Sequence, residues 1–114
     1  MIRIYGIKTC DTCRRARKWL ADAGIEHEWI DLRAGGVDRA RLEQWRAALG
    51  AAALINKRSK TWRELSADER AAAQADPVAV LVDHPTLIKR PILETTAATL
   101  AGFSAASYAT AVAG

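Results

Sequence analysis

Residues 2–24, which read IRIYGIKTCDTCRRARKWLADAG, decide the fold of this chain. Apolar and polar side chains alternate over residues 2–6, and this pattern predicts a short strand. After a turn at residues 8–9, the spacing of the apolar residues predicts a helix over residues 12–23, which Gly24 ends. The apolar stripe of that helix consists of Cys13, Ala16, Leu20 and Ala23. The two cysteines of the chain, Cys10 and Cys13, are therefore expected at a strand-to-helix junction.

The rest of the chain predicts further helices and strands. Asp38 caps a helix over residues 38–49 that Gly50 ends, and a Ser-x-x-Glu capping box starts another helix at Ser66. Residues 51–63 are polar and are predicted to be irregular. The remaining expected elements are a strand over residues 26–32, a helix over 76–84 that Pro85 stops, a loop entering a strand over 87–94, a weak strand over 97–100 and a helix over 104–112 capped by Ser104.

The order of these elements indicates the fold class. The opening strand, helix and strand predict a parallel pair joined by a right-handed crossover, and the two closely spaced late strands predict a hairpin. The sequence therefore predicts an α/β fold, with a mixed four-stranded sheet flanked by helices.

Composition limits the possible functions. A chain of 114 residues is expected to form a single domain, 1–114, and no apolar run reaches the roughly 18 residues of a membrane span. We expect a cytoplasmic protein, no membrane association and a monomer. A net charge of +4 favours an anionic small substrate or an acidic partner over direct nucleic-acid binding. No metal site is expected, because His27 and His84 lack ligand spacing to the cysteines.

Cys10 is the predicted nucleophile. At the start of a helix its thiolate is stabilised by unpaired backbone N–H groups and by the helix dipole, which lowers the thiol pKa. The basic residues of the helix add positive potential: Arg14, Arg15, Arg17 and Lys18. Cys13, one turn further on, either resolves a mixed disulfide formed at Cys10 or is a small buried apolar residue. A thiol from solution, such as glutathione, is the other candidate for the resolving step.

Four separated segments carry a resemblance to a known family. They are residues 5–20, with the Cys-Asp-Thr-Cys motif, residues 54–62 (LINKRSKTW), residues 84–92 (HPTLIKRPI) and residues 102–104 (GFS). Together they resemble the arsenate reductase-like (ArsC) family, and within it the YffB/Spx branch, most of all the YffB subgroup. The resemblance implies a thioredoxin-like fold with an inserted helical segment at about residues 34–86. It also implies that Cys10 is the nucleophile, that Arg90 faces the thiol and that Pro91 follows a cis peptide bond.

The resemblance implies that arsenate reductases of this family have three arginines around the cysteine. This chain departs from that pattern. The first of these positions is Asn56 and the third falls near Gly102, so that only Arg90 remains. Arsenate reductases also lack the second cysteine of the pair. Arsenate reduction is therefore the second alternative function of this chain.

The resemblance to the YffB subgroup implies a glutathione-dependent thiol reductase that acts on a small or protein thiol or disulfide. Glutathione is then a co-substrate, and neither a metal nor a nucleotide is expected. The first alternative is an Spx-like, redox-responsive transcription regulator that binds RNA polymerase. The residues expected to bind glutathione or the substrate are Lys8, Thr12, Arg14, Asn56, Arg58, Arg90 and Pro91.

Overall fold

The computed structural model describes residues 2–35 and 37–113 of the chain. The described strands form one mixed four-stranded sheet in the order β2-β1-β3-β4. The strands are β1 (Ile2–Gly6), β2 (His27–Asp31), β3 (Ile92–Glu94) and β4 (Thr99–Ala101). β1 pairs with β2 in parallel, whereas β1 with β3 and β3 with β4 are antiparallel. The predicted α/β class, the parallel opening pair and the late hairpin are confirmed.

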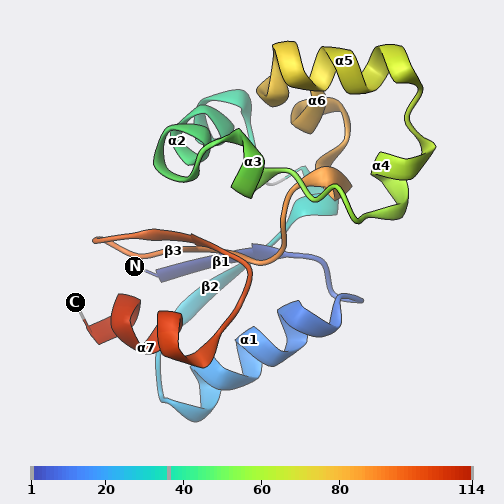
Figure 1. Cartoon of the computed structure of the whole chain (residues 1–114). Coiled ribbons are helices and arrows are strands. Elements are labelled where there is room, and N and C mark those ends of the chain that lie inside the picture. The colour runs from blue at the N-terminus through green and yellow to red at the C-terminus, as the bar shows by residue number, and fades with distance from the viewer. Residues whose placement is uncertain (1, 36, 114) are drawn as a thin grey trace.

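Helices cover both faces of the sheet (Figure 1). One face carries α1 (Asp11–Asp22) and α7 (Ala105–Ala113). The chain between β2 and β3 forms a helical layer on the other side of the sheet. Its members are α2 (Arg39–Leu49), α3 (Ala51–Leu54), α4 (Lys60–Glu64), α5 (Ala67–Ala75) and α6 (Pro77–Asp83), together with the 3₁₀ turns η1 (Leu32–Ala34) and η2 (Pro85–Leu87).

The alternation of side chains along the strands divides the core into two clusters. Ile4 of β1 and Leu93 of β3 pack with Ala16, Leu20 and other residues on the α1 and α7 side. Their neighbours point to the other face, where a larger cluster joins the sheet to the helical layer. That second cluster includes Tyr5, Trp45, Leu54, Leu81, Leu87 and Ile92.

The prediction that residues 51–63 are irregular is wrong in part, because this stretch contains α3 and most of α4. Gly50 adopts a φ of 83°, which turns the chain so that a new helix begins at the next residue. The Ser59 hydroxyl accepts a hydrogen bond from the backbone N–H of Trp62 and thereby caps α4. Both helices are too short to show a helical period in the sequence.

Several other boundaries also differ from the predictions by one or two residues. α1 ends at Asp22, so Ala23 is exposed and does not belong to the apolar stripe. The second strand ends at Asp31, whose carboxylate accepts a hydrogen bond from the Arg33 N–H and starts η1. The last strand begins later than expected, because the Thr95 hydroxyl accepts from the backbone N–H groups of Ala97 and Ala98 and forms the hairpin turn.

Candidate active site

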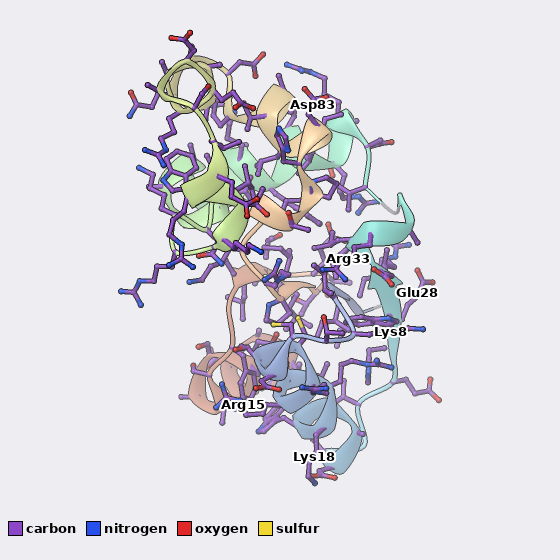
Figure 2. The ribbon with its side chains drawn as sticks, turned by 90° about the vertical axis from the view of Figure 1, so that its right-hand side faces the viewer. Lys8, Arg15, Lys18, Glu28, Arg33 and Asp83 are labelled. Carbon is purple, nitrogen blue, oxygen red and sulfur yellow. The ribbon has the colours of Figure 1, made fainter. Side chains whose placement is uncertain are left out.

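Cys10 lies where the loop after β1 enters α1. It is the N-cap residue of α1, with extended backbone angles, and its backbone N–H donates to the carbonyl of Ile7 at 3.1 Å. The thiol is half-buried, and neither cysteine is in a disulfide. Figure 2 shows the two sulfur atoms beside the N-terminal end of α1. The predicted placement of Cys10 at the start of the first helix is therefore confirmed.

The surroundings of Cys10 lower the pKa of its thiol. Burial raises the pKa. It is outweighed by hydrogen bonding to the backbone and thiol of Cys13, and by the hydrogen bonding and positive charge of the Arg90 guanidinium. The Cys10 sulfur makes no capping hydrogen bond of ordinary geometry. The N–H of Cys13 nevertheless lies close enough to stabilise a thiolate at this position. The result is a thiol that ionises more readily than an ordinary cysteine.

Cys13 has the opposite character. Its side chain is fully buried, and burial together with the neighbouring Cys10 raises its pKa to about 12, although hydrogen bonding to the Ile7 backbone and the charge of Arg90 act against this. The neighbouring Cys10 lies close enough to contribute to this shift. Cys13 is thus a buried thiol with a raised pKa, next to the accessible thiol of Cys10.

Gly6, the last residue of β1, makes room for this arrangement. A Cβ atom at position 6 would lie 2.5 Å from the sulfur of Cys13 and 3.0 Å from the indole ring of Trp29. Both distances are shorter than ordinary van der Waals contacts. The absence of a side chain at Gly6 therefore allows Cys13 to pack against the end of the strand.

Arg90 reaches Cys10 from the segment before β3. One guanidinium nitrogen, Nη1, donates to the carbonyl of Thr86 at 3.0 Å and fixes the side chain. Nε of Arg90 is buried and has no hydrogen-bond partner among the described residues. The peptide bond between Arg90 and Pro91 is cis, as the family resemblance implies. The side chain of Arg90 is thus fixed by one contact and has an unused donor beside the thiol.

A cavity of about 590 Å³ opens over Cys10. It brings together five of the predicted site residues: Cys10, Thr12, Asn56, Arg58 and Arg90. Residues that the sequence reasoning did not assign to binding complete its lining, and these are Arg15, Lys89, Ala101, Gly102 and Phe103. Arg15 lies one helical turn after Thr12, and Nη2 of Arg15 donates a hydrogen bond to the Thr12 hydroxyl at 3.4 Å. In the sequence, the three-residue spacing between Thr12 and Arg15 and the place of Lys89 next to Arg90 could have indicated that these two cations belong to the site.

Three predicted binding residues do not line this cavity. Lys8 is exposed in the loop before Cys10. Pro91, whose peptide bond to Arg90 is cis, is buried. Arg14 forms an ion pair with Asp11 and faces a different hollow of about 430 Å³. Their binding roles therefore stay predictions, and none of the three side chains borders the cavity over Cys10.

The basic side chains of α1 contribute less to the thiol than predicted. Lys18 pairs with Asp22 at 2.7 Å, and the guanidinium of Arg17 stacks on the ring of Trp29 at 4.3 Å. In Figure 2, Lys18 lies at the end of α1 that is far from the sulfur atoms. Arg90, which is distant in sequence, is the cation that lowers the pKa of Cys10.

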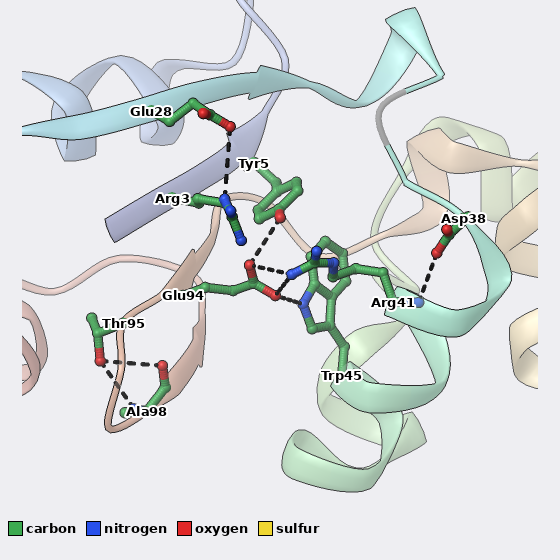
Figure 3. A network of polar contacts seen from close by, with 9 residues as sticks. All are labelled: Arg3, Tyr5, Glu28, Asp38, Arg41, Trp45, Glu94, Thr95 and Ala98. Atoms are coloured by element: carbon green, nitrogen blue, oxygen red, sulfur yellow. Dashed lines mark hydrogen bonds and ion pairs between the residues drawn. The ribbon is translucent and has the colours of Figure 1, made fainter. Parts of the chain in front are cut away.

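A polar network anchors β3, the strand that follows Arg90 and Pro91 (Figure 3). The carboxylate of Glu94 accepts hydrogen bonds from Tyr5 at 2.8 Å, from Trp45 at 2.7 Å and from Arg41 at 2.9 and 3.0 Å. A polar hollow of about 340 Å³ borders this network. Because Arg41 and Glu94 neutralise each other there, the network is structural and the cavity over Cys10 remains the candidate site.

Among the described residues, no group of three or more His, Cys, Asp or Glu side chains could hold a metal ion. None of the described helices has the length and apolar character needed to cross a membrane.

Comparison with known proteins connects this geometry to a family. The model of the ArsC family matches residues 5–111. A protein of Haemophilus influenzae, itself uncharacterized, is 46% identical and covers 99% of this chain and 100% of its own length. The solved structure of a YffB protein superposes with a TM-score of 0.92 at 36% identity, covering 97% of this chain and 98% of the other. The global transcriptional regulator Spx 2 of Bacillus anthracis is 25% identical over 82% of this chain and 72% of its own length.

Proposed function

Because this chain belongs to the ArsC family of thioredoxin-like proteins, we propose that it is a glutathione-dependent thiol reductase with Cys10 as its nucleophile. One observation carries the proposal. Cys10 is the accessible thiol of the pair, its pKa is lowered, and it faces a cavity lined by cations. Such a thiol is suited to attack the sulfur of an oxidised substrate, and glutathione, which is anionic at neutral pH, suits the charge of the cavity.

The proposed first step forms a mixed disulfide. The Cys10 thiolate attacks one sulfur of a substrate disulfide, a bond forms between Cys10 and that sulfur, and the substrate S–S bond breaks. Its electron pair leaves with the other half of the substrate, which takes up a proton as a thiol. Arg90, which contacts Cys10, stabilises the thiolate before the attack.

The second step restores the Cys10 thiolate, and two routes are possible. In one, the thiolate of glutathione attacks the substrate sulfur in the mixed disulfide, so that Cys10 leaves and a glutathione–substrate disulfide forms, which a second glutathione reduces. In the other, Cys13 attacks the sulfur of Cys10 and releases the substrate thiol. Two glutathione molecules then reduce the Cys10–Cys13 disulfide. The place of Cys13 one helical turn after Cys10, where each thiol shifts the pKa of the other, supports the second route.

The test compares wild type with Cys10→Ser and Cys13→Ser in the glutathione-dependent reduction of bis(2-hydroxyethyl) disulfide. We expect turnover by the wild type that disappears in Cys10→Ser. Activity retained by Cys13→Ser identifies glutathione as the resolving thiol, and its loss identifies Cys13. Absence of turnover by the wild type would overturn the proposal. A protein that uses reduced thiols and glutathione in this way is proposed to act in the cytoplasm.

Two alternatives are separated by the same set of experiments. The similarity to Spx 2 and the proximity of Cys10 and Cys13 favour a redox-responsive regulator as the second candidate. A regulator requires the Cys10–Cys13 switch without turnover, and the protein would then co-purify with RNA polymerase. An arsenate reductase predicts glutathione oxidation that depends on arsenate, with Cys10 attacking the arsenic atom.

A further inference from the structure

The cavity over Cys10 differs from the rest of the surface in its charge balance. Its lining contains four cationic side chains, which come from three parts of the chain: Arg15, Arg58, Lys89 and Arg90. None of its lining residues is acidic, and none of these four cations forms an ion pair with a carboxylate in the described part of the chain. Elsewhere many cations are neutralised, as in the pairs Arg14–Asp11, Lys18–Asp22 and Arg41–Glu94. A concentrated, unneutralised charge of this kind attracts an anionic ligand.

Gly102 and Lys89 define one wall of this cavity. Gly102 adopts a φ of 82° and has no side chain, and its backbone N–H donates to the carbonyl of Pro91 at 2.9 Å. A Cβ atom built at Gly102 would lie 3.8 Å from Cε of Lys89, which is van der Waals contact. The aliphatic stem of Lys89 therefore passes across the bare backbone of Gly102. The half-buried Lys89 side chain thus brings its ammonium group to the cavity.

We propose that Lys89 is a specificity-determining residue, and that with Arg58 and Arg15 it selects small sulfur compounds that carry at least two anionic groups. The identification of the ligand as a sulfur compound rests on the function proposed above. The Arg90 guanidinium is held by the Thr86 carbonyl and lies beside the Cys10 thiol, so the other three cations of the lining are the ones placed to meet the rest of the ligand. One anionic group cannot neutralise three separated cations, whereas a ligand with two or three carboxylates can reach them from a single sulfur atom.

The first test measures the charge of the cavity without using the proposed reaction. Iodoacetate and iodoacetamide alkylate the same thiolate, with iodide as the leaving group, but only iodoacetate is anionic. The ratio of their rate constants therefore reports the local potential and cancels any change in the pKa of Cys10. The fully buried Cys13 is not expected to compete.

Removing one unscreened charge lowers this ratio. In Lys89→Met we expect the ratio to fall about two- to fivefold, as for one exposed charge interaction. Lys89→Arg keeps the ratio near that of the wild type. Lys60→Met is the matched control, because the Lys60 side chain is 85% exposed and pairs with Glu64 outside the cavity. An equal ratio in Lys89→Met and Lys60→Met would overturn the proposal.

The second test compares glutathione with the neutral dithiol dithiothreitol as the reducing thiol in the disulfide assay. Lys89→Met is expected to raise the KM for glutathione about two- to fivefold and to change kcat/KM for the neutral thiol by a smaller factor. Unchanged glutathione kinetics in Lys89→Met, with an active wild type, would refute the specificity role. If the wild type reduces nothing with either thiol, the proposed function fails, while the alkylation ratio still decides whether Lys89 supplies the charge.

Discussion

The strongest prediction concerns Glu94, the carboxylate that links β3 to β1 and α2. Its side chain is 14% exposed and accepts hydrogen bonds from Tyr5, Trp45 and Arg41. In Glu94→Gln, one of the two accepting oxygens becomes an NH₂ group. Trp45 can only donate, so the amide oxygen must turn toward it, and the NH₂ group then faces Tyr5 and Arg41. Tyr5 can reverse its hydroxyl and accept, but Arg41 loses one hydrogen bond and its counter-ion.

The structure gives the size of the effect. A hydrogen bond to a charged group contributes about 1.5–3 kcal/mol, and loss of one partner from a buried pair costs about 3–5 kcal/mol. The Arg41 side chain is 34% exposed, so water rehydrates it in part. We therefore expect Glu94→Gln to lower the free energy of unfolding by about 2–3 kcal/mol, which corresponds to roughly 6–18 °C in Tm for a domain of this size. Urea unfolding followed by circular dichroism measures this.

Glu28→Gln is the matched control for the Glu94 variant. Glu28 is also on a strand and faces an arginine, but its side chain is 54% exposed and lies 3.7 Å from Arg3. The control variant should change stability by less than about 0.5 kcal/mol. Equal effects of the two substitutions would refute the reasoning, because they would show that burial and the three donors add nothing.

The pH dependence of the same variant tests the charge of Glu94 directly. Burial raises its pKa, but the hydrogen bonds from Trp45, Arg41 and Tyr5 outweigh burial and leave the pKa below its usual range. A lowered pKa in the folded state stabilises the protein fully above the unfolded value of about 4.3, and this stabilisation is lost as the pH falls toward the folded value. The difference in unfolding free energy between wild type and Glu94→Gln should therefore be largest near pH 7 and shrink in acid. A difference that grows in acid would contradict this.

Two further predictions concern the thiols. Arg90→Met should raise the pKa of Cys10, because it removes a hydrogen bond and a positive charge from the thiolate, and the pH dependence of iodoacetamide alkylation measures this pKa; an unchanged pKa would exclude the proposed role of Arg90. Gly6→Ala should destabilise the protein by about 1–3 kcal/mol, because its Cβ would meet the sulfur of Cys13 at 2.5 Å. Cys13→Ala in the Gly6→Ala background should recover part of this loss, and purely additive effects would show that the two positions do not interact.

Local patterns were sufficient to predict much of the fold. The alternation in β1, the Asp38 cap of α2 and the reciprocal capping box of Ser66 and Glu69 are interactions between near neighbours, and the structure contains all of them. α3 and α4 were missed because they are held by burial of Leu54 and by the Ser59 cap, not by a repeated apolar spacing. The sequence patterns were therefore sufficient to locate the longer elements. They were not sufficient for the short helices α3 and α4, which depend on the surface that they cover.

The site divides in the same way. The motifs around Cys10, Asn56 and Arg90 led to positions that lie together in the structure. The contributions of Lys89 and of Arg14 depend instead on which way a long side chain is turned by its neighbours. Arg14 is drawn away by Asp11, while the stem of Lys89 passes 3.8 Å from the position that a Cβ of Gly102 would take. The Asp11–Arg14 pair has the i,i+3 spacing that helix geometry could have indicated, whereas the sequence gives no sign that Lys89 lies beside Gly102.

The two cysteines of the motif are separated chemically by their surroundings, and this fixes the order of the proposed reaction. The proximity of the two thiols lowers the pKa of Cys10 and raises that of Cys13, because a negative charge on one sulfur disfavours a second negative charge beside it. Once Cys10 is in a mixed disulfide it no longer carries a negative charge, and one of the causes that raise the pKa of Cys13 disappears. Burial, the largest cause, still raises the Cys13 pKa, but the Ile7 backbone and the charge of Arg90 then oppose burial without the Cys10 charge acting against them. Cys13 is therefore expected to become a nucleophile only after Cys10 has reacted.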